Sequence, residues 1–175
     1  LFHFYPGSLS YSIATVGCNF KCKFCQNADI AQMPEDHQGA IIGGVLTPDE
    51  IVASAKEHDC RSIAYTYTEP TAYFEFAHDT ARLAHEQGLL NVFVTNGYMT
   101  SAALDMIDPY LDAANVDLKA FRNEFYKTYC GARLEGVKET LVSMKSRGIF
   151  LEITTLLIPG LNDDPEELAD LADFI

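Results

Sequence analysis

Three cysteines near the start of the chain, Cys18, Cys22 and Cys25, lie in the run Cys-Asn-Phe-Lys-Cys-Lys-Phe-Cys. This C-x3-C-x2-C spacing places three thiols on one short loop. Iron–sulfur cubanes are held by cysteine thiolates, usually four of them. Three thiolates would hold three corners and leave one iron open, and an open position distinguishes catalytic from structural metal sites. The spacing therefore predicts a [4Fe–4S] cluster with one iron free to bind another molecule.

A zinc site or a set of buried free thiols is the alternative for these cysteines. Structural zinc takes four ligands, so His37, Cys60 or Cys130 would have to supply the fourth, and none lies at a usual zinc spacing. Disulfides are a poor alternative, because five cysteines is an odd count and a 175-residue chain does not need them. We assign no catalytic part to Cys60, expected at a helix end, or to Cys130, expected in a turn between helices.

The composition limits the class of protein. The 175 residues suffice for one domain with a sizeable core, and an apolar fraction of 48% is typical of a globular protein. A formal net charge of −13 argues against nucleic acid as a partner, because phosphate binding needs clustered Lys and Arg. No apolar stretch is long enough to span a membrane and no signal-peptide pattern is present. We therefore expect a cytoplasmic protein with reduced cysteines and no membrane partner.

Short apolar segments alternate with helical periods along the whole chain. The expected strands are residues 12–16, 62–68, 90–95, 114–118 and 149–156. The expected helices begin at Pro48, run from Pro70 to Gly88, follow Thr100, run from Leu134 to Arg147, and begin at Pro165. Such strand–helix repeats with short loops predict an α/β fold with a parallel sheet, either open and doubly wound or a complete or partial barrel.

The domain organisation is simple. No linker or low-complexity segment divides the sequence, so residues 1–175 are expected to form one domain. The chain begins at Leu1 and stops at Ile175 inside an expected helix. We therefore expect this domain to be a fragment of a longer protein.

The fourth expected strand has two different faces. Val116 and Leu118 alternate with Asn115, Asp117 and Lys119. A parallel strand covered by helices on both sides is apolar on both faces. The polar face therefore predicts a wet interior or a functional site. The alternatives are a buried Asp–Lys ion pair and a strand end that emerges into a loop.

Polar motifs follow the other expected strands. They are residues 66–70 (Thr-Tyr-Thr-Glu-Pro), residues 95–97 (Thr-Asn-Gly) and residues 159–163 (Pro-Gly-Leu-Asn-Asp). Each motif alone is also explained by a turn or a helix entry. Because ligands bind at the carboxyl ends of strands in barrels and in open α/β sheets, the motifs together predict one site around the cysteine loop.

These motifs, with residues 3–8 (His-Phe-Tyr-Pro-Gly-Ser) and residues 117–119 (Asp-Leu-Lys), resemble the radical S-adenosylmethionine (SAM) superfamily. Within it the chain is similar to the pyruvate formate-lyase activating enzymes and their relatives, and most of all to the AmmeMemoRadiSam-system branch. The resemblance covers essentially the whole chain. It implies a partial (β/α)6 TIM-like barrel, of which about five βα units are present here and the sixth strand would lie beyond Ile175.

The resemblance also implies the chemistry. The open iron of the [4Fe–4S] cluster would be chelated by the amino and carboxylate groups of SAM. One electron from a low-potential donor of the flavodoxin or ferredoxin type would cleave SAM to methionine and a 5′-deoxyadenosyl radical, which abstracts hydrogen. The partner implied by the activating enzymes is a glycyl radical enzyme.

The family motifs assign roles to individual residues. Cys18, Cys22 and Cys25 would hold the cluster, with Phe24 packed beside it. Glu69 ends the segment that matches the family's Gly-Gly-Glu motif, which contacts the SAM amino group. Because a threonine replaces the second glycine, the Thr68 hydroxyl or a main-chain carbonyl would meet the ammonium instead.

The third and fourth strand ends complete the expected site. Asn96 matches the family's Asp-Thr-Asn-Gly strand end near the ribose and the methionine, although Val94 replaces its aspartate. Asp117 is expected to contact SAM or a cation. Lys119 is expected to contact a carboxylate or the substrate.

Three functions are consistent with the sequence. The first is a radical SAM enzyme that makes a glycyl radical on a partner protein. The second is a radical SAM enzyme that modifies another small molecule or macromolecule. The third is a non-enzymatic iron–sulfur or zinc module, which SAM cleavage would separate from the first two.

Overall fold

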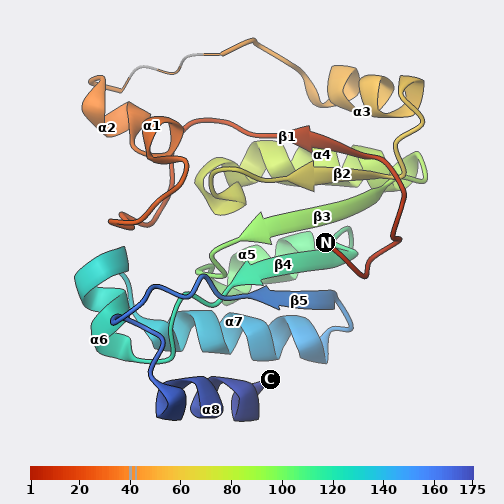
Figure 1. Cartoon of the computed structure of the whole chain (residues 1–175). Coiled ribbons are helices and arrows are strands. Elements are labelled where there is room, and N and C mark those ends of the chain that lie inside the picture. The colour runs from red at the N-terminus through yellow and green to blue at the C-terminus, as the bar shows by residue number, and fades with distance from the viewer. Residues whose placement is uncertain (40, 42) are drawn as a thin grey trace.

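The computed structural model describes residues 1–39, 41 and 43–175, and it holds one sheet of five parallel strands (Figure 1). The strands are β1 (Ser10–Ile13), β2 (Ser62–Tyr65), β3 (Leu90–Thr95), β4 (Ala113–Asp117) and β5 (Phe150–Thr154). They lie side by side in chain order, and every pair is parallel. A doubly wound sheet reverses its strand order at a switch point. The unbroken order is therefore that of a partial barrel, which is open between β1 and β5 among the described residues.

Helices cover the outer face of this sheet. The longer ones are α3 (Pro48–Glu57), α4 (Phe74–Glu86), α5 (Ser101–Ile107), α7 (Leu134–Ser146) and α8 (Pro165–Phe174). Figure 1 shows α4, α5 and α7 behind the sheet, while all five strands point toward the edge where the shorter segments α1 (Ala28–Ala31), α2 (Met33–Asp36) and α6 (Asn123–Phe125) lie. Within the described ranges, no helix is both long and apolar enough to cross a bilayer.

The helix starts follow the expected capping chemistry. The Thr47 hydroxyl accepts a hydrogen bond from the backbone N–H of Glu50 (3.3 Å), and the Glu50 carboxylate accepts one from the backbone N–H of Thr47 (2.8 Å). This is a capping box, with Pro48 in the first helical turn. Thr100 caps α5 by accepting from the backbone N–H of Ala103, and Asp164 caps α8 by accepting from those of Glu166 and Glu167. The start of each of these helices is confirmed.

Several expected bounds of strands and helices were wrong. The first strand covers residues 10–13 rather than 12–16, β2 stops at Tyr65, and β5 stops at Thr154. Beyond these points the polar residues no longer pair in the sheet and belong to the loops at its carboxyl edge. The helix expected from Pro70 begins instead as the 3₁₀ segment η1 (Pro70–Tyr73), and α4 starts only at Phe74. The short segments α1, α2 and α6 and the π-helix η2 (Tyr126–Cys130) were not predicted, because three to five residues carry no readable period.

The core lies between the sheet and its helices. Tyr65 and Phe93 point to this side from neighbouring positions of β2 and β3, are fully buried, and pack with ring centroids 5.2 Å apart. Asn91 is buried there too, and its amide donates to the backbone oxygens of Ala81 (2.9 Å) and Tyr110 (3.0 Å). Its side-chain oxygen accepts from the Tyr65 hydroxyl (3.0 Å), so the amide has partners for both of its ends.

The two faces of β4 differ as predicted. Val116 and Leu118 are fully buried, while Asn115, Asp117 and Lys119 are only partly buried on the other side. β4 thus presents an apolar face to the helices and a partly polar face to the barrel interior. This asymmetry positions the site at the inner, carboxyl-end rim.

Gly97, two residues after the end of β3, provides a test of this packing. Its φ is +72°, and a Cβ atom there would lie 2.7 Å from Cγ1 of Val116. We expect Gly97→Ala to lower the free energy of unfolding by about 2–5 kcal/mol, from left-handed strain together with overpacking. Urea unfolding measures this. Gly88→Ala is the matched control, because Gly88 also has a positive φ (+79°) but open space around it. Equal losses in the two variants would contradict the close approach.

Candidate active site

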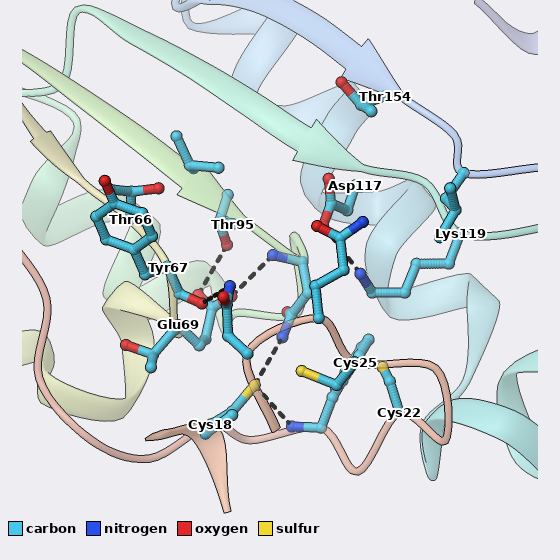
Figure 2. Close-up of a pocket in the computed structure, with 18 of the residues that line it drawn as sticks. Cys18, Cys22, Cys25, Thr66, Tyr67, Glu69, Thr95, Asp117, Lys119 and Thr154 are labelled. Atoms are coloured by element: carbon cyan, nitrogen blue, oxygen red, sulfur yellow. Dashed lines mark hydrogen bonds and ion pairs between the residues drawn. The ribbon is translucent and has the colours of Figure 1, made fainter. Parts of the chain in front are cut away.

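A pocket of about 430 Å³ lies at the carboxyl ends of the strands. Its lining includes every residue that the sequence assigned to the site: Cys18, Cys22, Phe24, Cys25, Thr68, Glu69, Asn96, Asp117 and Lys119. Figure 2 shows the cysteine loop on one side of this pocket, with Glu69 and Thr95 at the ends of β2 and β3, and Asp117 and Lys119 at the end of β4. The fold thus brings together the predicted residues from segments far apart in the sequence.

The cysteine loop is held in place by backbone hydrogen bonds to other segments. Gly17 donates to the backbone oxygen of Ile30 (3.0 Å), Lys21 to that of Cys130 (3.0 Å), and Lys23 to that of Tyr129 (2.8 Å). The residues on both sides of Cys22 are therefore fixed to the end of the π-helix η2.

The sulfur atoms of this loop are partly buried. Burial raises the pKa of Cys18 to about 11. A hydrogen bond with Cys130 and burial both raise the pKa of Cys22. Since metals bind the thiolate, these thiols would have to lose their protons to hold an iron–sulfur cluster.

The donor groups around Cys18 suit an iron–sulfur cluster. Its Sγ atom accepts from the backbone N–H of Phe20 (3.4 Å) and from the side-chain amide of Asn96 (3.8 Å). Hydrogen bonds to ligand sulfurs are a general feature of such clusters. Among the described residues, no three His, Cys, Asp or Glu side chains lie close enough to share one metal ion. A cubane binds each thiolate through a different iron, so its cysteines do not have to converge on one point.

Glu69 lies at the end of β2 and is 1% exposed. One carboxylate oxygen accepts from the hydroxyls of Thr95 (2.8 Å) and Thr71 (3.0 Å) and the Thr71 backbone N–H (3.2 Å). The other accepts from the backbone N–H of Asn96 (2.8 Å). Burial raises the pKa of Glu69, and these four hydrogen bonds oppose the rise. The carboxylate thus binds the end of β3 to the start of η1.

Asn96 extends this network to the cysteine loop. Its side-chain amide donates to Oδ1 of Asn19 (2.6 Å), and the Asn19 amide donates to the backbone oxygen of Tyr98 (2.9 Å) and to the Thr71 hydroxyl (3.1 Å). Asn96 and Asn19 therefore connect β3 to the residue that follows Cys18.

Tyr67 and Thr68 stand where the family motif has two glycines, and Tyr67 keeps a backbone conformation typical of glycine. Tyr67 has φ +66°, in the left-handed region that bulky residues rarely occupy. Its backbone oxygen accepts from the Asn27 amide (2.7 Å), which helps to hold this conformation. The Thr68 hydroxyl donates to the backbone oxygen of Thr15 (2.7 Å), which leaves its lone pairs available to accept from an ammonium group.

Asp117 and Lys119 form an ion pair inside the pocket, with Nζ of Lys119 2.9 Å from Oδ2 of Asp117. Burial lowers the pKa of Lys119, but the charge and hydrogen bond of Asp117 and the nearby Cys22 and Cys130 together raise it, so the net direction is upward. The buried Asn162 amide holds the backbone here by donating to the carbonyls of Lys119 (2.7 Å) and Leu156 (2.9 Å). The ion pair, one of the alternatives given from the sequence, is present, and both of its residues line the pocket.

Phe24 lines the pocket and packs against Phe125 of α6, with ring centroids 5.6 Å apart. Sequence reasoning missed the place of Cys130 beside the site. Cys130 is the buried last residue of a π-helix rather than part of a simple turn, and it lies against Cys22. Sequence reasoning also missed the supporting roles of Thr71 and Thr95. No sequence signal marked Cys130, because its neighbour in space lies in a different part of the chain.

Comparison of the sequence with known proteins identifies the family. Residues 12–172 match the model of the radical SAM superfamily. An uncharacterized protein of Methanocaldococcus jannaschii is 44% identical over 175 residues, which are all of this chain and 51% of that protein. The chain thus spans about half the length of this relative.

One further relative and one solved structure match at lower identity. The pyruvate formate-lyase-activating enzyme of Clostridium pasteurianum is 26% identical over 165 residues, covering 91% of this chain and 66% of that enzyme. The crystal structure of Streptococcus suis SuiB bound to S-adenosylmethionine superposes with a TM-score of 0.72 at 16% identity, covering 95% of this chain and 38% of that one. The superposition supports the TIM-like barrel fold. By its sequence match along residues 12–172, the chain belongs to the radical SAM superfamily.

Proposed function

We propose that this protein is a radical SAM enzyme that binds a [4Fe–4S] cluster through Cys18, Cys22 and Cys25 and binds SAM in the adjacent pocket. The observation that carries the proposal is the meeting of all three cysteines with the polar ends of β2, β3 and β4 around one cavity of about 430 Å³. When bound, the cluster supplies the electron that cleaves SAM to a 5′-deoxyadenosyl radical. The protein positions the two groups and limits side reactions.

The side chains around the pocket divide the binding of SAM among them. The Thr68 hydroxyl and the backbone oxygens of residues 66–68 accept from the ammonium group of SAM. Asn96, whose side-chain amide donates to the Cys18 sulfur (3.8 Å), would orient the methionine end. Asp117 and Lys119 contact the remaining polar groups of SAM or the substrate. Glu69 positions these residues rather than binding SAM itself, because its carboxylate already accepts four hydrogen bonds.

We propose a glycyl radical enzyme as the first candidate substrate. It is supported by the similarity to a pyruvate formate-lyase-activating enzyme at 26% identity. A different small-molecule or macromolecular substrate is the second candidate, supported by the departures from the family motifs at Tyr67, Thr68 and Val94. A glycyl radical signal in electron paramagnetic resonance (EPR), formed on a co-purified or genomically adjacent partner, separates the two.

The proposed reductant is a flavodoxin- or ferredoxin-type protein in the cytoplasm. Lys21 and Lys23 flank Cys22 in the cysteine loop, and the Lys23 ammonium lies 5.5 Å from the Tyr129 ring centroid. Lys21 is ion-paired with Glu35 (2.7 Å), so the attraction for an acidic electron carrier on a protein of net charge −13 would come mainly from Lys23. A reduction rate that falls steeply with salt supports this, and a rate independent of salt contradicts it.

The function is tested by anaerobic reconstitution of the whole protein with iron and sulfide, followed by addition of reductant and SAM. We expect 5′-deoxyadenosine from the wild-type protein and none from a variant with Cys18, Cys22 and Cys25 all replaced by alanine. A cluster that forms but never yields 5′-deoxyadenosine, with or without candidate substrates, would support the non-enzymatic iron–sulfur module.

Asp117 provides a separate test of SAM binding. We expect Asp117→Asn to weaken SAM binding about tenfold while cluster absorbance is retained, since a charge-assisted hydrogen bond contributes about 1.5–3 kcal/mol. Equilibrium binding of SAM to the reconstituted protein measures this. Asp79→Asn, at an exposed position of α4, is the control and should bind SAM as the wild type does. Unchanged affinity in Asp117→Asn would remove Asp117 from the site.

A further inference from the structure

Tyr67, two residues after the end of β2, presents its ring at the opening of the pocket. It is 57% exposed and is one of the residues that line the pocket (Figure 2). Tyr65, by contrast, is fully buried, and its hydroxyl donates to the Asn91 side chain (3.0 Å). Within the described ranges, Tyr67 does not join the hydrophobic core. Its large ring is therefore available to contact a ligand in the pocket.

The backbone at Tyr67 forms a tight γ-turn. The backbone N–H of Thr68 donates to the carbonyl of Thr66, two residues earlier (2.8 Å), and the φ of Tyr67 between them is +66°. A γ-turn whose central residue has a positive φ is rare and strained, and a bulky side chain adds to the strain. Glycine adopts such a backbone without steric cost. The stability of the turn therefore does not explain why a tyrosine occupies it.

Hydrogen bonds from neighbouring segments hold the turn in place. The residue before Tyr67 donates its backbone N–H to the carbonyl of Ile13 (3.0 Å), and the Thr68 hydroxyl donates to the carbonyl of Thr15 (2.7 Å). The Asn27 amide donates to the carbonyl of Tyr67 itself (2.7 Å). Strained conformations persist where the surrounding structure fixes them, and they cluster at ligand sites. The backbone thus keeps the ring at the pocket despite the strain.

Tyr5 offers a comparison at the other end of the sheet. It also has a positive φ (+48°) and an exposed ring, but the guanidinium of Arg61 lies 3.7 Å from its ring centroid. The ring of Tyr5 thus makes a cation–π contact inside the protein. Among the described residues, no Lys or Arg side chain lies over the ring of Tyr67. The face of the Tyr67 ring is therefore open to a cation that enters the pocket.

We propose that Tyr67 is a contact residue for SAM: its ring packs over the methionine end of the bound molecule, which carries an ammonium and a sulfonium, and covers the opening of the pocket. This inference rests on the proposed function, which places the ammonium against the carbonyls of residues 66–68. An aromatic face attracts cations, and the attraction is stronger where water is excluded. The contact explains why a strained turn carries a tyrosine.

The test is equilibrium binding of SAM to the reconstituted protein, with urea unfolding of the cluster-free proteins alongside. Tyr67→Phe keeps both the ring and the strain. Tyr67→Ala removes the ring and keeps the strain, whereas Tyr67→Gly removes the ring and relieves the strain. Tyr5→Ala is the matched control, because it removes an exposed ring from another residue of positive φ, outside the pocket.

We expect SAM to bind about tenfold more weakly to Tyr67→Ala and Tyr67→Gly, which is the scale of one aromatic contact. Tyr67→Phe and Tyr5→Ala should bind SAM as the wild type does. Tyr67→Gly should unfold at a higher urea concentration than Tyr67→Ala, so the pair separates affinity from stability. A merely structural role of the ring would lower the unfolding midpoint of both variants and leave their affinity for SAM unchanged.

A fluorescent reporter tests the contact directly. The chain contains no tryptophan, so Tyr67→Trp introduces a single indole at the opening of the pocket. Its emission maximum should move to a shorter wavelength when SAM is added to the reconstituted protein, because the ligand removes the ring from water. Phe150→Trp is the control, since Phe150 is the first residue of β5 and lies outside the pocket. Its emission maximum should not change.

Two results would overturn the inference: wild-type affinity for SAM in whichever of Tyr67→Ala and Tyr67→Gly folds, or an emission maximum of Tyr67→Trp that SAM does not move. Binding by Tyr67→Phe as weak as that by Tyr67→Ala would assign the contact to the hydroxyl and overturn the role of the ring. Absence of SAM binding by the wild-type protein would overturn the proposed function as well, whereas SAM binding that does not depend on Tyr67 overturns this inference alone.

Discussion

Cys22→Ala should abolish cluster retention and SAM cleavage together. The substitution removes one of the three protein ligands of the cubane and leaves two thiolates, and the alanine side chain offers no replacement. Iron content per chain, the cluster absorbance and the yield of 5′-deoxyadenosine measure the two losses. We expect iron near the background of the triple-alanine variant and no 5′-deoxyadenosine above the uncatalysed level.

The control for this variant is Cys60→Ala, which removes a thiol outside the pocket. It should keep both the cluster and the cleavage activity. Cys18→Ala and Cys25→Ala should behave as Cys22→Ala does, since each removes one of the three ligands. A Cys22→Ala protein that still forms 5′-deoxyadenosine would refute the ligand assignment, and rescue through the neighbouring Cys130 would then be tested with the double variant.

Glu69→Ala should cause a large loss of stability in the cluster-free protein. The carboxylate is 1% exposed and accepts four hydrogen bonds from Thr71, Thr95 and Asn96. Its removal leaves these buried donors unpaired and opens a cavity, so we expect a loss of about 3–5 kcal/mol in the free energy of unfolding. Urea unfolding measures it. Glu57→Ala, at the exposed end of α3, should change stability by less than about 0.5 kcal/mol.

Glu69→Gln separates the charge of Glu69 from its volume. The glutamine keeps one acceptor oxygen, but its amide group is itself a donor and meets another donor in a site where all four partners donate. We expect an intermediate loss of about 1–3 kcal/mol and weaker SAM binding, because Asn96 shifts with its backbone. Wild-type stability in Glu69→Gln would show that the carboxylate does not hold the end of β3.

The part of the fold that depends on local patterns could be predicted from the sequence. The capping box at Thr47, the glycine after α4 at Gly88 and the alternation around Val116 each depend on neighbours within a few residues, whose spacing can be counted along the chain. The same is true of the cysteine spacing. Parallel pairing then follows, because short strands separated by helices leave no other connection.

The site could be predicted as a set of residues but not as a geometry. All nine assigned residues line the pocket, because motifs at the carboxyl ends of parallel strands meet at one edge of a sheet. The sequence alone did not indicate that Glu69 would be buried among four donors. That depends on where β3 ends relative to η1, and therefore on the register of β2 and β3.

Cys130 shows the limit most directly. From the sequence it is a cysteine between two helices, far along the chain from the cysteine loop. The fold places it beside Cys22 because β4 and η2 bring Lys119, Tyr126 and Cys130 to the same rim as the loop. The sequence by itself predicted three thiols on one loop at the pocket and the parallel α/β fold, since both follow from local spacing. Only the tertiary structure decided which side chains surround those thiols, because such contacts join segments that no local period connects.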